Sequence, residues 1–112
     1  MDKLKKYQNS IKNIISNYAT IRYPKREESE LQTVFDDKNN HYYLMDIGWE
    51  DMTRIHSCLL HIDIKDGKIW IQKDFTEKGI AIDLLEAGIA RTEIVLGFQA
   101  PFKRPFTEFA VV

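Results

Sequence analysis

The segment His61-Ile-Asp-Ile-Lys-Asp-Gly-Lys-Ile-Trp-Ile-Gln72 predicts a tight β-hairpin. In it, Asp66-Gly67 separates two runs in which apolar residues alternate with other side chains. A two-residue hairpin turn of type I′ requires positive φ at both central residues, and the Asp-Gly pair tolerates this well. We therefore expect two antiparallel strands joined at Asp66-Gly67.

Counting outward from this turn predicts which side chains share a face of the sheet. One face is aliphatic and pairs isoleucines across the hairpin: Ile64 with Ile69, and Ile62 with Ile71. The other face is polar and aromatic: Asp63 lies opposite Trp70, and His61 opposite Gln72. The aliphatic face suits a core, so the polar-aromatic face is left for another role.

Alternation of period two extends over most of the middle of the chain and predicts four strands in total. These are Glu30–Asp36, His41–Trp49, Arg54–Ile64 and Lys68–Lys73, with a turn at Asp37–Asn40. We interpret Glu50–Thr53 as a four-residue loop, because this gathers the apolar residues of the second and third strands on one side. That side would carry Tyr43, Met45, Ile47, Cys58, Leu60, Ile62 and Ile64. A three-residue loop would invert the second strand.

Two segments have helical periodicity. Apolar residues at three- and four-residue steps predict a helix over residues 3–20, followed by a loop from Ile21 to Ser29 that contains Pro24. A second helix is expected to begin at Thr76-Glu77, to include Gly79, and to end with Gly88 as a left-handed cap. Its buried stripe would be Ile80, Ala81, Leu84 and Leu85.

These elements predict an α+β fold in a single domain spanning residues 1–112. The N-terminal amphipathic helix and the second helix would pack on one face of a mainly antiparallel, four- to five-stranded meander sheet. Residues 94–98 and 107–111 are short apolar segments separated by Pro101 and Pro105. We expect them to cover the open side of the sheet or to add an edge strand.

The composition favours an ordered protein of a reducing compartment. Hydrophobic residues make up 44% of the 112 residues and charged residues 29%, values typical of globular domains. The single cysteine, Cys58, excludes an intrachain disulfide, and the N-terminus lacks the apolar stretch of a signal peptide. We expect a cytoplasmic protein without a membrane-spanning segment.

The charge pattern argues against a dedicated duplex-binding domain. The formal net charge is −1, whereas proteins that neutralise several phosphates are usually strongly basic. Basic residues nevertheless gather in the first quarter of the chain: Lys3, Lys5, Lys6, Lys12, Arg22, Lys25 and Arg26. Acidic neighbours interrupt them, so we interpret this region as a solvated helix face.

Several residues invite a chemical interpretation. His61 and Asp63 lie two apart on one strand face, and with Asp74 they could form a metal-assisted hydrolytic cluster. A strand histidine between Leu60 and Ile62 more often simply finds a hydrogen-bond partner, so no metal ligand, cofactor or catalytic residue is expected. Cys58 is interpreted as a buried structural thiol. Acid–base chemistry requires carboxylates close to one another, and sequence spacing cannot place the available ones within such a distance. These are Asp46, Asp63, Asp74, Glu77 and Glu108.

The two tryptophans, Trp49 and Trp70, bear on partner binding. Aromatic residues on an open sheet face are enriched at protein interfaces. The alternative is that the C-terminal segment covers Trp70 with its phenylalanines: Phe98, Phe102, Phe106 and Phe109. The candidate partner-binding surface is the polar-aromatic one: His61, Asp63, Trp70, Gln72 and Asp74.

The hairpin segment from His61 to Gln72 also resembles a known family. The resemblance extends to other positions along essentially the whole chain: Asp74, Thr76-Glu77, Gly79-Ile80-Ala81, Ile94-Val95-Leu96-Gly97-Phe98 and Thr107-Glu108-Phe109-Ala110. These residues resemble the XisI family, the excision-controlling factor of the cyanobacterial fdxN element. One departure is Gly88-Ile89-Ala90-Arg91, where the family often has glycine, a hydrophobic residue, proline and lysine.

The resemblance implies a regulatory protein of cyanobacteria. Such a protein helps to control developmentally programmed excision of a DNA element, while a separate recombinase performs strand exchange. The resemblance also implies a companion factor, XisH, whose fold resembles that of nucleases. It supplies no catalytic residues.

Three functional hypotheses follow from the sequence. The leading one is a regulatory subunit that binds a companion protein and is not an enzyme. The second is a metal-assisted nuclease or hydrolase that uses His61, Asp63 and Asp74. The third is direct binding of DNA through the lysine-rich first helix, whereas the leading hypothesis involves DNA only indirectly. The sequence leaves the oligomeric state open, self-association included.

Overall fold

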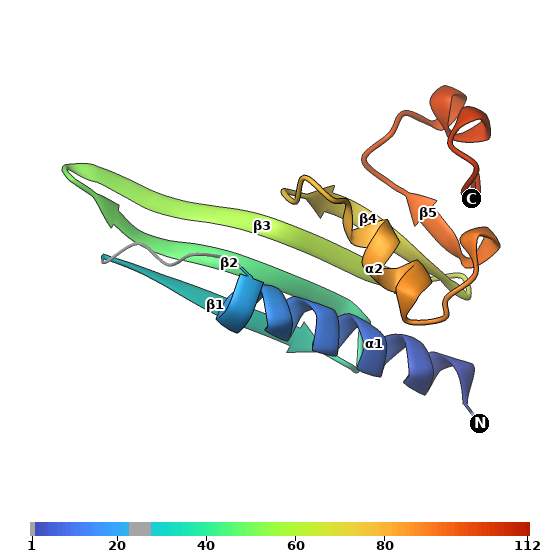
Figure 1. Cartoon of the computed structure of the whole chain (residues 1–112), viewed down its shortest axis with the longest axis horizontal. Helices are drawn as coiled ribbons and strands as arrows, with labels where there is room; N and C mark the ends of the chain where they lie inside the picture. Colours follow the sequence, from blue (N-terminus) through green and yellow to red (C-terminus); the bar gives the residue numbers. More distant parts are fainter. Residues whose placement is uncertain (1, 23–27) are drawn as a thin grey trace.

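A computed structural model gives the fold, and it describes residues 2–22 and 28–112. The chain forms two α-helices and one five-stranded sheet, with the elements in the order α1 (Lys3–Asn17), β1 (Ser29–Asp36), β2 (His41–Glu50), β3 (Thr53–Lys65), β4 (Lys68–Asp74), α2 (Ile80–Glu86) and β5 (Ile94–Leu96). The predicted α+β class is confirmed, and each predicted strand lies within two residues of its observed bounds. Figure 1 shows the sheet with α1 and α2 packed along it.

The first helix begins at a side-chain cap and continues beyond α1. Asp2 caps α1 by accepting a hydrogen bond from the Leu4 backbone N–H at 3.1 Å. A π-helical segment, Tyr18–Arg22, continues α1, so the chain is still helical at the point where the loop was expected. Residues 23–27 of that predicted loop lie outside the described residues, and Ser29, its expected last residue, already begins β1. Neither described helix combines the length and apolarity that would be needed to cross a bilayer.

The five strands follow one another across the sheet in chain order, from β1 to β5. The first three pairings are antiparallel, and β5 pairs with β4 in parallel after the α2 crossover. The parallel strand confirms that residues 94–96 add an edge strand, while Ala110 forms an isolated bridge to Val95. The prediction of a mainly antiparallel sheet with an added edge strand is therefore confirmed.

The Asp66-Gly67 turn has the predicted geometry. Asp66 has φ of 54° and Gly67 has φ of 74°, as a type I′ turn requires. Three predicted pairs are present: Ile64 with Ile69, Ile62 with Ile71, and Asp63 with Trp70. The fourth is wrong, because a bulge at Gln72 shifts the register and places His61 opposite Lys73.

A second bulge overturns the predicted face of β2. Close to the turn the register is as expected, with Met45 opposite Cys58 and Ile47 opposite His56. The register then shifts by one residue at Leu59, so that Leu44 lies opposite Leu60 and Tyr43 opposite His61. The helix side of β2 therefore carries Tyr42, Leu44, Asp46 and Gly48, all buried. The predicted core positions Tyr43, Met45 and Ile47 are only half-buried.

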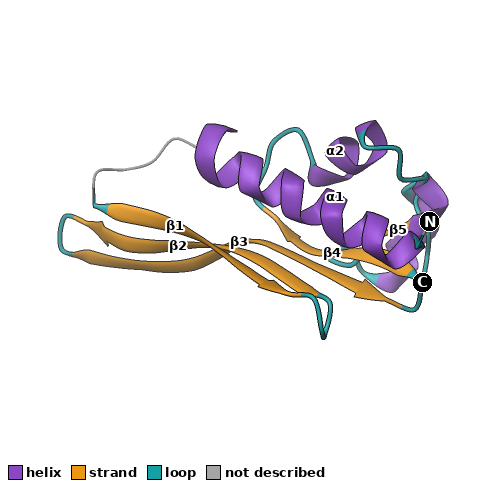
Figure 2. Cartoon of the chain, turned by 90° about the horizontal axis from the view of Figure 1, so that it is seen from below, coloured by secondary structure: helices purple, strands orange, loops and turns teal. Residues whose placement is uncertain are grey.

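The core lies between the two helices and one face of the sheet (Figure 2). From α1 it receives Tyr7, Ile11 and Ile15, and from α2 Ile80, Ala81 and Leu84. The sheet contributes fully buried side chains: Tyr42, Leu44, Leu60, Ile62, Ile69, Ile71 and Ile94. The expected aliphatic face is confirmed, although Ile64 is half-buried near the β3–β4 turn.

The second helix is shorter than predicted. Gly79 was expected inside it, but with φ of 94° it occupies the N-cap position, and the helix begins at Ile80. The predicted glycine cap is confirmed at the other end: Gly88 has φ of 92°, and its backbone N–H donates to the Leu85 carbonyl at 3.0 Å.

Candidate functional site

The sheet face opposite the helices carries a connected group of polar and aromatic side chains. We call it the open face and define it by His41, Tyr43, His61, Asp63 and Gln72. Strand pairing builds it: His41 of β2 lies opposite Asp63 of β3, and Tyr43 lies opposite His61. Asp63 and His61 are two residues apart on β3, so all four side chains point to the same side.

Asp63 is the centre of this group. Its Oδ1 lies 2.8 Å from His41 Nδ1 and 2.9 Å from His61 Nε2. Its Oδ2 accepts a hydrogen bond of 3.3 Å from Gln72 Nε2, which the bulge on β4 brings within reach. Burial alone would raise the pKa of Asp63, but the hydrogen bond from His41 and the charge and hydrogen bond of His61 outweigh it and hold the pKa below its ordinary value.

Trp70 lies beside this group but is almost fully buried. Only 9% of its surface is exposed. Lys65 Nζ lies 4.6 Å from the centre of a Trp70 ring, and the Arg104 guanidinium lies 5.2 Å from it. The C-terminal segment therefore does cover Trp70, through Arg104. Of the phenylalanines expected in this role, three are exposed: Phe98, Phe102 and Phe106.

Asp74, the last residue of the predicted surface, lies elsewhere. Because of the bulge at Gln72 it pairs with Leu60, whose side chain is in the core. Its carboxylate accepts hydrogen bonds from the Thr76 backbone N–H at 2.9 Å and the Ile80 backbone N–H at 2.8 Å. The structure thus unites His61, Asp63 and Gln72, places Trp70 beneath Arg104, and assigns Asp74 to the start of α2.

His41 is the residue that the sequence analysis missed in this group. Its position at the start of β2 gave no signal by itself, because its distance from Asp63 depends on the bulge at Leu59. Had that register shift been known, the pairing of His41 with Asp63 would have followed by counting.

The environment of Cys58, the single cysteine, disfavours a nucleophilic role. Cys58 is half-buried, and burial is the main reason that its pKa lies above the ordinary value. Its Sγ donates to the Leu60 carbonyl at 3.1 Å. A raised pKa disfavours the reactive thiolate. The predicted core position of Cys58 is wrong, because the bulge at Leu59 leaves it opposite Met45 on the side of the sheet away from the helices.

The lysines of α1 are partly used within the fold. Lys3 forms an ion pair of 2.8 Å with Glu93, and Lys12 forms one of 2.8 Å with Asp37. Lys6 Nζ lies 3.5 Å from the Gly88 carbonyl. The side chain of Arg22, together with Lys25 and Arg26, lies outside the described residues. The described part of the basic cluster therefore offers few uncommitted charges for phosphates.

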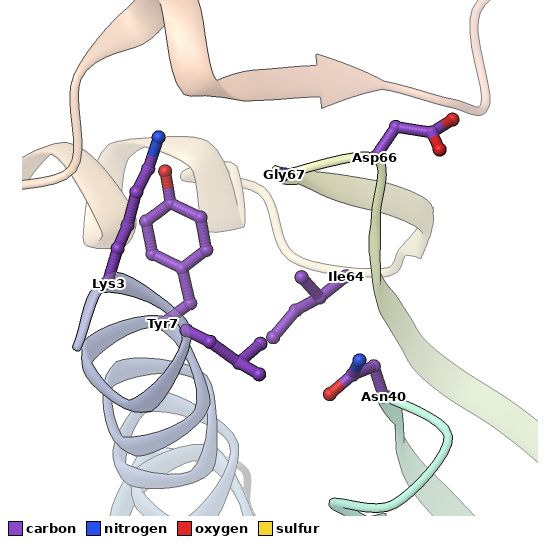
Figure 3. Close-up of a pocket in the computed structure, with 7 residues that line it drawn as sticks. Lys3, Tyr7, Asn40, Ile64, Asp66 and Gly67 are labelled. Atoms are coloured by element: carbon purple, nitrogen blue, oxygen red, sulfur yellow. The ribbon is translucent and has the colours of Figure 1, made fainter.

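A pocket of about 290 Å³ lies between the start of α1 and the β3–β4 turn (Figure 3). Its lining consists of Lys3, Leu4, Tyr7, Asn40, Ile64, Asp66 and Gly67. Glu93 engages both Lys3 and the Tyr7 hydroxyl, and Gln8 Nε2 donates to Asn40 Oδ1 at 3.0 Å. Because these polar groups already serve the fold, the pocket is less suited to recognising a ligand than the open face is.

The β2–β3 turn carries the most exposed large side chains in the middle of the chain. We call residues 48–55 the hairpin tip; it projects beyond both helices (Figure 1). Trp49 is 47% exposed and Met52 is 95% exposed. The Arg54 guanidinium lies 5.3 Å from the centre of a Trp49 ring, which holds the indole in place at the surface.

These features define a small α+β protein with two helices on one face of a mixed five-stranded sheet and a polar-aromatic open face. The chain belongs to the XisI family, because the family model described as XisI protein matches residues 1–111. No protein with curated annotation matches the sequence.

Solved structures support this membership. A XisI-like protein from Anabaena variabilis ATCC 29413 is 42% identical, with a TM-score of 0.91 over 97% of this chain and 99% of that one. The fdxN element excision controlling factor XisI from the same strain is 35% identical, with a TM-score of 0.87 over 99% of this chain and 100% of that one. Both similarities cover nearly all of this chain.

Proposed function

We propose that this chain helps to control excision of a DNA element by binding a companion protein, without cleaving DNA itself. The similarity to an excision controlling factor over the full length supports the process. The exposed hairpin tip supports the mode of action. Tryptophan, arginine and methionine are enriched at protein interfaces, and here all three lie on one projecting turn.

The companion that we propose is a protein resembling XisH, with DNA contacted through that protein. The distribution of charge supports an indirect role: the net charge is −1, and Lys3 and Lys12 are paired with carboxylates. The hairpin tip, rather than Trp70, is the proposed anchor, because an indole that is 47% exposed can be buried by a partner and one that is 9% exposed has little left to bury.

The arrangement of acidic groups argues against the hydrolytic cluster of His61, Asp63 and Asp74. Asp63 lies on the open face, while Asp46 is buried on the helix side of β2 and Asp74 holds the start of α2. The cluster of His61, Asp63 and Asp74 suggested by spacing is therefore divided between opposite faces of the sheet. We expect the purified chain to leave duplex DNA intact, as measured in a cleavage assay with divalent cations.

Titration calorimetry of the chain against a purified companion resembling XisH tests the proposal. Replacing Trp49 with alanine is expected to weaken binding about thirtyfold, as loss of an interface hot spot does. Phe106→Ala is a matched control, because Phe106 is also an exposed aromatic residue, 84% exposed, in a different segment. This variant should bind as the wild type does.

Two results would contradict the proposal. Absence of a complex at micromolar concentrations would exclude the companion as a direct partner. If Phe106→Ala weakened binding and Trp49→Ala did not, the C-terminal segment and not the hairpin tip would be the contact surface.

A further inference from the structure

We propose that His41, His61 and Asp63 form a binding site for a divalent transition-metal ion of the zinc type. One ligand atom from each residue converges on the same point of the open face, and the three atoms lie within 4.8 Å of one another. Imidazole and carboxylate groups together suit Zn²⁺ and its first-row neighbours, whereas Mg²⁺ and Ca²⁺ prefer oxygen ligands alone. This inference does not rest on the proposed function.

Two of the distances between the three ligand atoms are somewhat shorter than those of a metal site, and all three lie within 4.8 Å. Ligands at 2.0–2.2 Å from a tetrahedral Zn²⁺ lie about 3.3–3.6 Å from each other. Asp63 Oδ1 is 2.8 Å from His41 Nδ1 and 2.9 Å from His61 Nε2. Small side-chain rotations that open these contacts by about half an ångström would admit the ion.

The hydrogen-bonded form of the cluster can change to a metal-binding form through a change of imidazole tautomer. Without an ion, His41 Nδ1 and His61 Nε2 can each donate a proton to the same oxygen of Asp63. A metal ion needs lone pairs at these two nitrogens, so in the bound form each neutral imidazole carries its proton on the other ring nitrogen, His41 Nε2 and His61 Nδ1. After the small rotations described above, the same three side chains then hold the ion.

The surroundings orient the ligands. The Tyr43 ring lies 4.4 Å from the His61 ring and 6.5 Å from the His41 ring, centre to centre, and limits the rotation of both imidazoles. Gln72 Nε2 donates to Asp63 Oδ2 at 3.3 Å, which leaves Oδ1 directed at the histidines. Such outer contacts fix ligand orientation in known metal sites. All these residues lie on neighbouring strands, which supply a rigid base.

The site is accessible from solvent. The side chains of His41 and His61 are 45% and 29% exposed, and that of Asp63 is 15% exposed. An ion can therefore enter directly, and water would complete its coordination, as in zinc sites with three protein ligands.

Titration of the purified chain with Zn²⁺ near neutral pH tests the inference. We expect one ion per chain. The affinity for Zn²⁺ should fall by a factor of about 10 or more in His41→Ala and in His61→Ala. His56→Ala is the matched control, because His56 is an exposed histidine on β3 that lies outside the cluster. Cys58→Ser controls for the thiol, and both control variants should bind as the wild type does. Mg²⁺ should give no signal.

Nuclear magnetic resonance of the imidazole nitrogens tests the same site without any substitution. Zn²⁺ should shift His41 Nδ1 and His61 Nε2 toward the values of metal-bound nitrogen and leave His56 unchanged. Absence of binding up to about 1 mM Zn²⁺, the weakest affinity worth considering, would overturn the inference. So would unchanged affinity in His41→Ala, or imidazole shifts confined to His56.

Discussion

At the residue scale, Tyr7 links the first helix to the turn that precedes β5. It is 2% exposed, and its hydroxyl donates to the Glu93 carboxylate, which also pairs with Lys3 at 2.8 Å. Burial is the main cause that raises the pKa of Tyr7 to about 12, and the hydrogen bond to Glu93 adds to it. An unfolded chain has no such environment, so its tyrosines ionise at about pH 10.

This difference in pKa predicts alkaline sensitivity. Between about pH 10 and pH 12 the unfolded chain loses the Tyr7 proton while the folded chain keeps it, so the free energy of unfolding falls as pH rises. We expect Tyr7→Phe to remove part of this fall, as measured by urea unfolding at several pH values. Tyr43→Phe, on the open face, is the comparison, because burial raises the pKa of Tyr43 less than that of Tyr7 and its loss should remove a smaller part of the fall. Identical pH slopes for the wild type and Tyr7→Phe would contradict the prediction.

At the element scale, Asp74 determines where α2 begins. Gly79 has no side chain with which to cap the helix, and the Asp74 carboxylate takes that role by accepting from the Ile80 backbone N–H at 2.8 Å. It also accepts from the Thr76 hydroxyl at 2.6 Å, which closes the turn before the helix. One side chain thus joins the end of β4 to the start of α2.

Removing this cap has a measurable cost. Asp74→Ala is expected to lower the free energy of unfolding by about 1–2 kcal/mol, the usual loss for an N-terminal helix cap, as measured by urea denaturation. Lys73→Ala, one residue earlier and exposed, should change it by less than about 0.5 kcal/mol. If both variants unfolded at the wild-type urea concentration, Asp74 would have no capping role.

The strands show what sequence reasoning can and cannot supply. The Asp66-Gly67 turn was predictable because a two-residue turn of known chirality fixes the register beside it. The bulges at Leu59 and Gln72 were not, since the apolar residues of β2 lie on both faces and mask the change of phase. The bulge at Leu59 places each side chain of β2 on the face opposite to the predicted one, as a three-residue loop between β2 and β3 would also have done.

The candidate site was affected in the same way. His61 and Asp63 could be placed together because they lie two residues apart on one strand. His41 required the register of a different strand pair, and Asp74 left the surface because the bulge at Gln72 turned it toward α2. Coverage of Trp70 by the C-terminal segment was one of two alternatives left open, and the Arg104 guanidinium provides it.

At the scale of the whole molecule, the helices stabilise one face of the sheet and the C-terminal segment closes its last edge. The Ala110 backbone N–H donates to the Ile94 carbonyl at 2.8 Å beside β5. Arg104 attaches the segment more widely, with its Nε 3.1 Å from the Gln99 carbonyl and its guanidinium over Trp70. The hairpin tip, at the other end of the sheet, stays free of this packing (Figure 1).

This arrangement predicts that Arg104 controls the exposure of Trp70. Its guanidinium also lies 3.4 Å from the Val111 carbonyl and 3.5 Å from the Gly97 carbonyl, so Arg104→Ala should cost about 1–3 kcal/mol of unfolding free energy. In a Trp49→Phe background only Trp70 fluoresces, and we expect red-shifted emission and easier quenching by acrylamide. Lys103→Ala, beside Phe102 and away from the indole, is the control and should leave both unchanged. Emission that Arg104→Ala did not alter would mean that the strands alone bury Trp70, and that the C-terminal segment can detach without exposing it.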